Sequence, residues 1–249
     1  MRKVFFLLSL LAIAGSLFAQ RESTSKDDEF YKERGVDIAF GIHVGIPTKE
    51  MRKAIRNNMM DMGFGLNLVV VSDPVLWFND RAASSPVRLG FDVGYTYYGR
   101  FLTEVVINGI KGDYKTSYGI GHLNGILRLR PPGHSAFIPF VDGLMGLNVY
   151  FSSTKENFDF IESALGLESL AFGGTASASF VKGFGAGISI GRKNPNRPRI
   201  TLRATYQVGS SIKYVERNSI TYQPGSDHLY YIEGRAPVKY FTAQVGIGL

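Results

Sequence analysis

Large apolar residues alternate with small or polar ones along residues 36–46. The even positions from Val36 to Ile46 are all large and apolar, and the odd positions between them are small or polar. Successive side chains of a β-strand point to opposite faces. The segment therefore predicts a strand with one face suited to hydrocarbon and the other suited to a narrow polar interior.

The same alternation returns in seven later segments. They are 62–70, 87–97, 117–130, 137–151, 177–190, 199–212 and 238–249. A tilted strand needs about 9–11 residues to cross a bilayer, so each segment is of roughly membrane-crossing length. The pattern predicts an all-β chain that forms a transmembrane antiparallel up-and-down β-barrel of eight strands, with ten strands as the open alternative.

A soluble barrel or sandwich is the competing fold, because alternation alone does not say which face is wet. Soluble barrels point their apolar face inward and carry Lys, Glu and Asp outside. Here the face opposite the large apolar residues is mostly Gly, Ser, Thr and Asn, with isolated charges. Glycine weakens a solvent-facing strand but relieves crowding inside a narrow barrel. This composition favours the membrane barrel.

The connections between the predicted strands indicate an orientation. If the chain starts in the periplasm, the outer connections are 48–60, 99–116, 152–175 and 213–236, and all are long. The inner connections include two short turns, 131–136 and 191–198. Long outer loops with short inner turns are typical of outer-membrane barrels. The third inner connection, 72–86, is longer and contains the only tryptophan, Trp77.

Aromatic residues gather at the predicted strand ends, where amphipathic rings favour the edges of a bilayer. We expect an outer belt and an inner belt. The outer belt comprises Phe64, Tyr95, Tyr97, Tyr118, Tyr150, Phe151, Tyr240 and Phe241. The inner belt comprises Phe40, Trp77, Phe137 and Phe140.

The first residues have the form of a secretory signal peptide. Basic Arg2 and Lys3 precede an apolar run to about Ala14, and small residues follow. The run is shorter than the roughly 20 apolar residues that a membrane-spanning helix needs. Cleavage is expected after Ala19, with Ser16 as the alternative. The predicted organisation is a signal peptide at 1–19, a short periplasmic segment at 20–34 and the barrel at 35–249.

Charge and cysteine content narrow the possible partners. The chain has no cysteine, so it has no disulfide and no cysteine-based metal site. Loss of Arg2 and Lys3 with the signal peptide leaves 26 of the 28 basic residues against 21 acidic ones, a mild and scattered excess. We expect no nucleic-acid partner for an exported chain with this charge. The 29 glycines occur beside 13% aromatic residues, a composition typical of β-barrels.

Three segments resemble the small outer-membrane β-barrel superfamily of the OmpA transmembrane domain, OmpX-like and opacity-type proteins, including the "porin family" barrels of Bacteroidota. They are Phe137-Ile138-Pro139-Phe140-Val141-Asp142-Gly143, Arg203-Ala204-Thr205-Tyr206 with the following Ile212-Lys213-Tyr214-Val215, and the alternating final strand. The resemblance covers about residues 35–249. It implies residence in the outer membrane of a Gram-negative bacterium and insertion by the barrel-assembly machinery. Members usually end in Phe, whereas this sequence ends in Leu249.

Six charged residues fall on the predicted inner face of the barrel. They are Asp37, Arg88, Asp92, Arg128, Asp142 and Arg203. Charges persist in a low-dielectric interior only when they are paired or hydrogen-bonded. Both signs are present, so we expect a salt-bridge network across the lumen with a structural role.

Possible catalytic groups are few. His134 and Ser135 are adjacent in an inner turn, so their side chains point apart and lack the geometry of a nucleophile and its base. Asp227 and His228 lie in the fourth outer loop and resemble the rim residues of omptin-type proteases, which have ten strands. His43 and Asp37 are six residues apart on one strand, about 20 Å, too far to share a metal ion. We expect no catalytic, metal or cofactor site.

The first outer loop carries a basic cluster. Met51, Ala54, Ile55 and Met59 recur at helical spacing, which predicts a short amphipathic helix across the barrel rim. Its other face would present Lys49, Arg52, Lys53 and Arg56. The dense anions at such a surface are those of lipopolysaccharide, so these four residues are the candidate lipopolysaccharide contact. A solvated loop whose charges serve only solubility is the alternative.

The sequence therefore favours a non-enzymatic surface barrel whose outer loops bind a ligand, lipopolysaccharide or a partner protein, within outer-membrane lipid. The alternatives are an accessory subunit of an envelope or secretion complex, a small passive channel and, least favoured, a lipid A-modifying enzyme.

Overall fold

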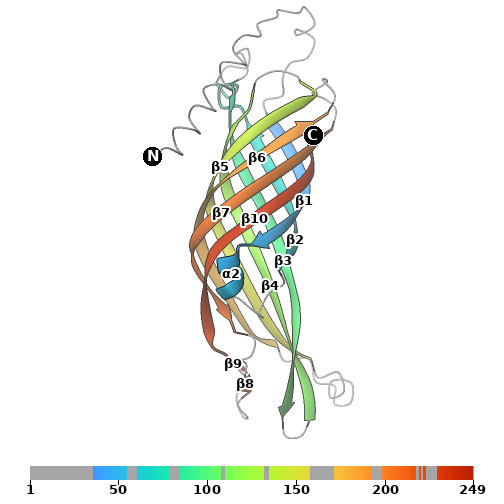
Figure 1. Ribbon diagram of the computed structural model, residues 1–249, viewed down its shortest axis with the longest axis vertical. Helices are drawn as coiled ribbons and strands as arrows, with labels where there is room; N and C mark the ends of the chain where they lie inside the picture. Colours follow the sequence, from blue (N-terminus) through green and yellow to red (C-terminus); the bar gives the residue numbers. More distant parts are fainter. Residues whose placement is uncertain are drawn as a thin grey trace, which may run out of the picture.

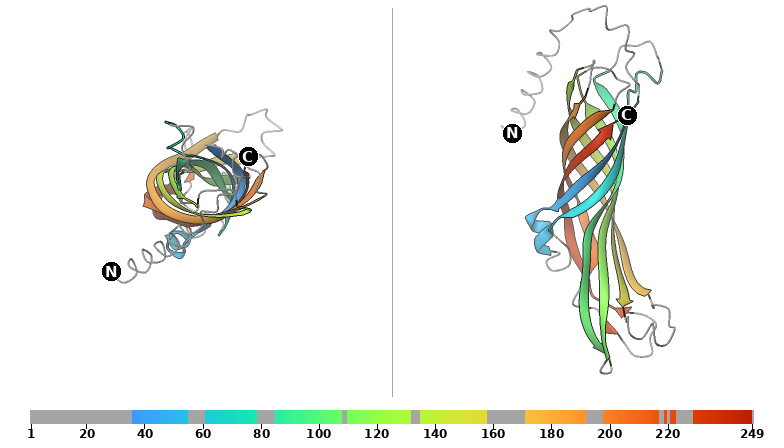
Figure 2. Two further views of the ribbon diagram at one scale, coloured as in Figure 1. Left: turned by 90° about the horizontal axis from the view of Figure 1, so that it is seen from above. Right: turned by 90° about the vertical axis from the view of Figure 1, so that its right-hand side faces the viewer.

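The computed structural model is a closed antiparallel β-barrel of eight strands (Figure 1). It describes residues 36–54, 61–78, 85–107, 110–131, 135–157, 171–191, 198–216, 219, 221–222 and 229–248. The strands follow one another around the ring in sequence order, and the last pairs with the first. Seen from above, they enclose a ring (Figure 2, left). The prediction of eight strands rather than ten is confirmed.

The barrel strands differ in length by about a factor of two. They are β1 (Val36–Pro47), β2 (Gly63–Ser72), β3 (Val87–Ile107), β4 (Ile110–Leu129), β5 (Phe137–Asn157), β6 (Ala171–Ile190), β7 (Arg199–Val215) and β10 (Glu233–Gly248). A short helix α2 (Lys49–Ala54) follows β1. The two-residue strands β8 (Thr221–Tyr222) and β9 (Leu229–Tyr230) pair with each other outside the barrel.

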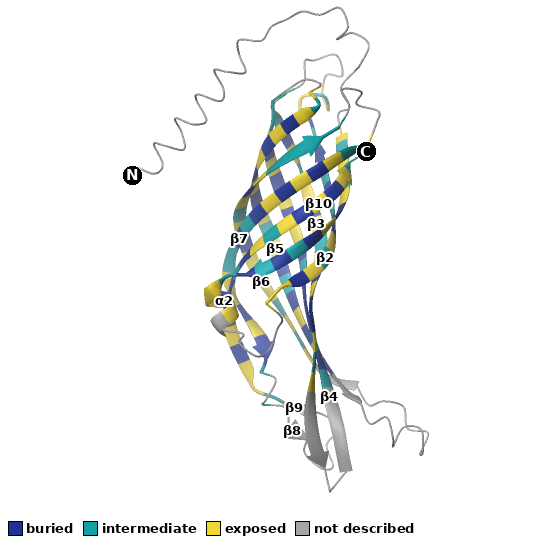
Figure 3. Ribbon diagram, turned by 45° about the vertical axis from the view of Figure 1, so that its right-hand side comes forward, coloured by how far each residue is buried: buried dark blue, intermediate teal, exposed yellow. Residues whose placement is uncertain are grey.

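The predicted in–out alternation is present along the strands, as the alternating exposed and buried residues in Figure 3 show. The even residues of β1 are exposed or half-exposed, and His43 between them is buried. We call the exposed apolar surface around the barrel the lipid-facing band. Its members are Val36, Ile38, Phe40, Ile42, Phe64, Leu66, Leu89, Phe91, Val93, Tyr95, Tyr97, Leu123, Leu127, Leu129, Phe137, Val141, Met145, Leu147, Phe151, Phe180, Phe184, Ile200, Leu202, Phe241, Val245 and Ile247.

Polar residues occupy much of the inside instead, so the barrel has the polarity of a membrane barrel rather than a soluble one. No helix among the residues described above is long and apolar enough to span a membrane.

One of the predicted outer loops, 99–116, is largely strand. Residues 99–116 form the outer parts of β3 and β4, which pair as far as Ile107 and Ile110. The prediction of a long loop here was wrong, because the strands continue beyond the β-bulge that interrupts the alternation. A β-bulge lies between Tyr97 and Arg100, where Gly99 adopts φ 101°. Only glycine adopts this conformation without strain, so the bulge has a local cause in the sequence.

The outer rim is uneven. β1 ends at Pro47 and β2 begins at Gly63, so β3 loses its β2 partner after Tyr97. β3 nevertheless continues to Ile107, ten residues and about 33 Å further. β3 and β4 extend far beyond α2 (Figure 2, right). The outer end is therefore a projecting sheet on one side and a low rim bearing α2 on the other.

The inner connection after β2 holds an ordered turn. The carboxylate of Asp73 accepts hydrogen bonds from the backbone N–H groups of Val75 (3.0 Å) and Ser85 (2.8 Å). Trp77 and Phe78 are exposed beside it, at the end of the barrel where both described chain ends lie. Exposed aromatic rings favour a membrane–water interface, which at this end of the barrel is the inner edge of the bilayer that the barrel spans.

Candidate functional site

The centre of the lumen is held by Arg203, which projects inward from β7. Its Nε donates to Asp142 Oδ2 (2.7 Å) and its Nη1 donates to Asp92 Oδ2 (2.6 Å). Nη1 also lies 3.3 Å from Gln244 Oε1. Arg203 thus joins β7 to β3, β5 and β10, and it is almost completely buried.

The two carboxylates have further partners. Asp142 accepts a bidentate pair of hydrogen bonds from Arg128 Nε (2.7 Å) and Nη2 (3.0 Å). The Arg128 guanidinium also lies 3.8 Å from the centre of the Phe140 ring, a cation–π contact. Asp92 accepts from Asn67 Nδ2 (3.2 Å) and lies 3.2 Å from His122 Nε2. Two arginines and two aspartates therefore form a charge-balanced cluster that spans the lumen.

The other two predicted lumen charges lie apart from this cluster. Arg88 pairs with Asp73 (3.3 Å), and both are fully buried. Asp37 accepts a hydrogen bond from Arg130 Nη1 (2.7 Å) at the inner end of the barrel. The structure therefore brings four of the six predicted residues together. It pairs the other two, Arg88 and Asp37, with residues outside the predicted network. Arg130 lies two residues after Arg128 and so on the same inward face, which could have identified it. Asp73 lies in a turn, where no alternation indicates an inward position.

The outer part of the lumen is apolar and aromatic. A buried cluster, which we call the outer plug, fills it; it consists of Met51, Tyr98, Tyr118, Ile120, Tyr150, Val181, Ile212, Tyr214, Ala236, Val238 and Tyr240. The Tyr240 hydroxyl accepts from Asn148 (2.7 Å) and donates to Gln207 (3.0 Å). The Tyr118 hydroxyl donates to the Val215 carbonyl (3.1 Å).

The outer plug corrects the predicted aromatic belts. Tyr118, Tyr150 and Tyr240 were assigned to the outer belt and Phe140 to the inner one, but all four point into the lumen and are buried. The assignment failed because a tyrosine suits both a bilayer edge and a tight interior in which its hydroxyl finds a partner. Phe64, Tyr95, Tyr97, Phe151 and Phe241 are exposed on the outer wall.

Helix α2 sits on the low rim with one side chain inside the barrel. Met51 is fully buried in the outer plug, while Lys49 and Arg52 are exposed on the helix's other side. Glu50 forms an ion pair with Lys239 of β10, which fixes the helix to the wall. Arg52 Nε lies 3.3 Å from Asp61 in an exposed pair. Of the other basic residues of the candidate lipopolysaccharide contact, the Lys53 side chain and Arg56 lie outside the described residues, as do Ile55 and Met59.

The residues weighed for catalysis are not assembled into a reactive group in the described part of the chain. The ring nitrogen Nε2 of His43 hydrogen-bonds the Thr96 hydroxyl (2.7 Å), while Asp37 is engaged by Arg130. Ser135 Oγ accepts a hydrogen bond from the Phe137 N–H (3.3 Å). No group of three or more His, Asp or Glu residues among those described is arranged to hold a metal ion. His134, Asp227 and His228 lie outside the described residues.

Comparison with known proteins gives similarity of fold alone. No protein-family model and no curated protein matches the chain. Among solved structures, it is similar to a major outer membrane protein of Thermus thermophilus, with a TM-score of 0.48 at 12% identity over 86% of this chain and 98% of that one. It is also similar to Neisserial surface protein A, with a TM-score of 0.46 at 11% identity over 87% and 97%. Outer membrane protein OprG of Pseudomonas aeruginosa gives 0.44 at 15% identity over 88% and 96%.

Proposed function

We propose that this outer-membrane barrel is a non-enzymatic surface protein that binds a ligand, lipopolysaccharide or a partner protein through its outer end. The observation that carries the proposal is the contrast between the two parts of the molecule. The lumen is occupied by the charge cluster and the outer plug, whereas β3 to β6 build a sheet that projects well past the low rim. An eight-stranded barrel has an interior that side chains just fill. Binding at the outer surface therefore fits this architecture better than transport through the lumen.

Lipopolysaccharide is the ligand that the low rim favours. Lys49 and Arg52 are exposed on α2, and the sequence adds Lys53 and Arg56 within the next four positions. The acids beside them are already engaged, Glu50 with Lys239 and Asp61 with Arg52. No ion pair between described residues includes Lys49, so we expect this side chain to meet an external anion. Coulomb attraction to phosphate and carboxylate groups at this rim would act over a Debye length of about 8 Å.

The test uses lipopolysaccharide from which the acyl chains have been removed, so that only the outer end is probed. Folded protein in detergent is compared with the variant K49Q/R52Q/K53Q/R56Q at low and high salt. The variant R192Q/K193Q/R197Q is the matched control, because it removes three positive charges from the chain between β6 and β7. We expect the first variant and high salt to abolish binding, and the control to bind normally. Unchanged binding of the first variant at low salt would refute the rim as an anion site.

A planar-bilayer recording tests the other half of the proposal. We expect no stable conductance from purified, folded protein, because the charge cluster and the outer plug occupy the lumen in series. Reproducible open-channel steps would favour the passive channel instead. Co-purification of a fixed set of envelope proteins from outer membranes would favour the accessory subunit.

A further inference from the structure

Lys182 is a charged residue on an apolar wall. It faces outward from β6 between Phe180 and Phe184 of the lipid-facing band, and its neighbours across the adjacent strands are Met145 and Val208. Between the first and last members of the band on each strand, Lys182 is the only outward-facing charged side chain among the described residues; Arg100 is also exposed, but it follows the β-bulge of β3. A lysine surrounded by apolar side chains in hydrocarbon is costly unless an anion meets it.

The position along the strand places this charge near the outer headgroups. Ile190 lies at the inner end of β6, eight residues from Lys182. Eight residues span about 26 Å along a strand, which a tilt of about 40° reduces to a rise of about 20 Å. The apolar band of such barrels is about 25 Å tall. The ammonium group is therefore within reach of the outer headgroup layer, with Phe180 and Leu147 still beyond it on the wall.

Lys239 is a second outward-facing lysine on this wall, and it has an ion-pair partner within the protein. It lies two strands away from Lys182 in the same cross-strand row, joined through Val208. Lys239 stands just beyond the band and has a carboxylate of the protein as its partner, that of Glu50. None of the ion pairs between described residues includes Lys182. The protein supplies an anion to one of the two lysines, and the surroundings of the other leave lipid as the source.

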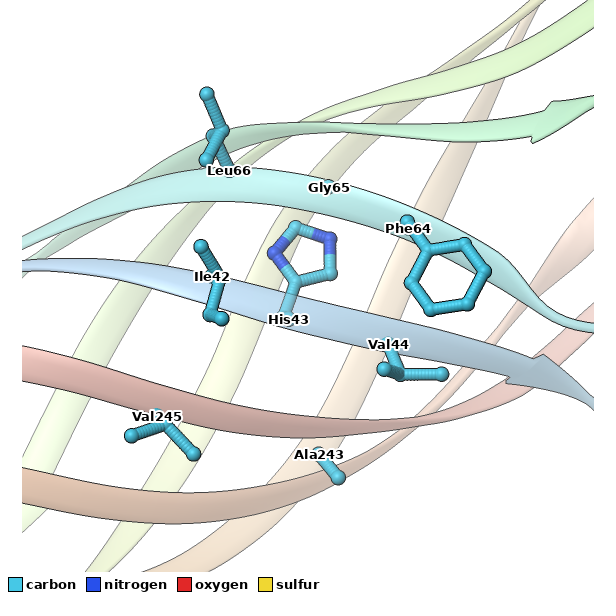
Figure 4. Close-up of a pocket in the computed structure, with 8 residues that line it drawn as sticks. All are labelled: Ile42, His43, Val44, Phe64, Gly65, Leu66, Ala243 and Val245. Carbon is cyan, nitrogen blue, oxygen red and sulfur yellow. The ribbon is translucent and has the colours of Figure 1, made fainter.

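The wall below Lys182 is hollowed. The row beneath it consists of Phe184, Tyr206 and Phe241, whose rings are in contact, with centroids 5.8 and 4.6 Å apart. Below these rings a hollow of about 490 Å³ is lined by Ala186, Leu202, Ala204, Ala243, Val245 and Val44, and by Arg203 and Gln244, whose side chains point into the lumen. It adjoins a second apolar hollow of about 500 Å³ over β1 and β2, shown in Figure 4. Ala186 is four residues from Lys182, about 13 Å along the strand, which is within the roughly 15 Å depth of one leaflet.

We propose that Lys182 binds the phosphate of an outer-leaflet lipid, the lipid A part of lipopolysaccharide, and that an acyl chain of this lipid lies in the hollow over Ala204. The charge of the lysine selects an anionic headgroup, its height selects the outer leaflet, and the apolar hollow below accepts a chain. The site lies on the wall of the barrel and does not depend on what the outer end binds.

The experiment measures retention of lipid A by the folded, full-length mature protein, using native mass spectrometry in detergent. The probes are lipid A with its phosphates and the same lipid with the phosphates removed. We expect K182Q to lose about tenfold in affinity for the phosphorylated probe, and K182R to retain it, because a charge-assisted contact is lost only in the first. K213Q is the control, since Lys213 pairs with Glu233 at the outer ends of β7 and β10.

A separate variant tests the proposed site for the acyl chain. A204L fills the hollow from a lipid-facing position and is expected to weaken binding of both probes, whereas A178L, on the same face of β6 beyond Phe180, leaves binding unchanged. Gel mobility without heating verifies that each variant is folded. Equal affinity of K182Q and the unaltered protein for phosphorylated lipid A overturns the phosphate site, because the lysine then meets only water. A dimer that A204L dissociates assigns the hollow to a second copy and overturns the acyl site.

The α2 variant K49Q/R52Q/K53Q/R56Q separates this inference from the proposed function. It should keep its affinity for lipid A while losing the deacylated lipopolysaccharide. If that variant loses affinity for lipid A as well as for the deacylated lipopolysaccharide, all lipid binding lies at the rim and the wall site is overturned.

Discussion

Replacing Arg203 with methionine is the sharpest perturbation of the lumen. Methionine has a similar length but no charge, so the substitution removes donors without leaving a large void. The change takes the hydrogen bonds at 2.7 Å from Asp142 and at 2.6 Å from Asp92, together with the longer contact to Gln244.

The magnitude follows from the charge balance of the cluster. Arg128 and Arg203 face Asp92 and Asp142, so the substitution leaves one uncompensated negative charge in the lumen. Asp142 keeps its bidentate partner Arg128, and the deficit therefore falls on Asp92. Removing one partner of a buried ion pair costs about 3–5 kcal/mol. We expect a loss of this size in the free energy of unfolding.

A second substitution tests whether charge is the cause. In R203M/D92N both the arginine and the unpaired carboxylate are gone, and an amide at position 92 can still bond with Asn67 and His122. D92N alone instead leaves one positive charge in excess. We expect the double variant to recover to within about 2 kcal/mol of the unaltered protein, because a hydrogen bond between neutral groups contributes only about 1 kcal/mol. Both single variants should be less stable than the double one.

The assay is reversible urea unfolding in lipid vesicles, followed by the fluorescence of Trp77 at the inner end of the barrel. Gel mobility of unheated samples gives an independent measure of the folded fraction. If R203M/D92N is no more stable than R203M, charge balance does not govern the lumen, and the loss must come from packing around the substituted side chain.

Three other changes test the rest of the architecture. Deleting Phe241–Leu249 removes most of the β10 residues that pair with both β1 and β7. Unpaired backbone groups cost several kcal/mol each in hydrocarbon, so we expect unfolded periplasmic protein. Normal heat-modifiable, membrane-inserted protein would contradict the eight-strand closure. Met51→Ala empties part of the outer plug and should lower the free energy of urea unfolding by about 2–5 kcal/mol. Lys49→Ala, on the exposed side of α2, should leave it unchanged. Equal unfolding midpoints for the two variants would show that Met51 is not a packing residue. Gly65→Ala would place a Cβ against the Tyr95 carbonyl and 2.5 Å from His43 Nε2, and should cost about 3 kcal/mol. Gly125→Ala meets only the Met145 carbonyl at 3.5 Å and should fold normally on the same gels.

The sequence predicted the wall of the barrel well because hydrocarbon imposes a strong pattern on one face of each strand. The outward residues from Val36 to Ile46 had to be apolar, and the dyad could be read without knowing any partner. The β-bulge after Tyr97 interrupts this alternation, so the continuation of β3 to Ile107 has no comparable signal and the sequence predicts a loop there.

The interior was harder to predict because its contacts depend on the shear of the whole barrel. Arg203 and Asp92 are 111 residues apart in sequence and lie on strands that are not neighbours. Inward parity identified both as lumen charges, but only the closed register decides that they meet each other. The same limit explains the outer plug, since no local pattern distinguishes an inward Tyr150 from one at the membrane interface.

The bond between Arg203 and Asp92 also has a consequence for the order of folding. β7 and β3 are four places apart around the ring, so the two side chains meet only when the sheet has rolled into a cylinder. In an inserted but unrolled sheet, Asp92 would lack its arginine partner in a medium of low dielectric constant. The ion pair therefore gives nothing to partly assembled forms and its full contribution to the finished one. It acts as a check on ring closure, because only the closed barrel brings the two side chains together.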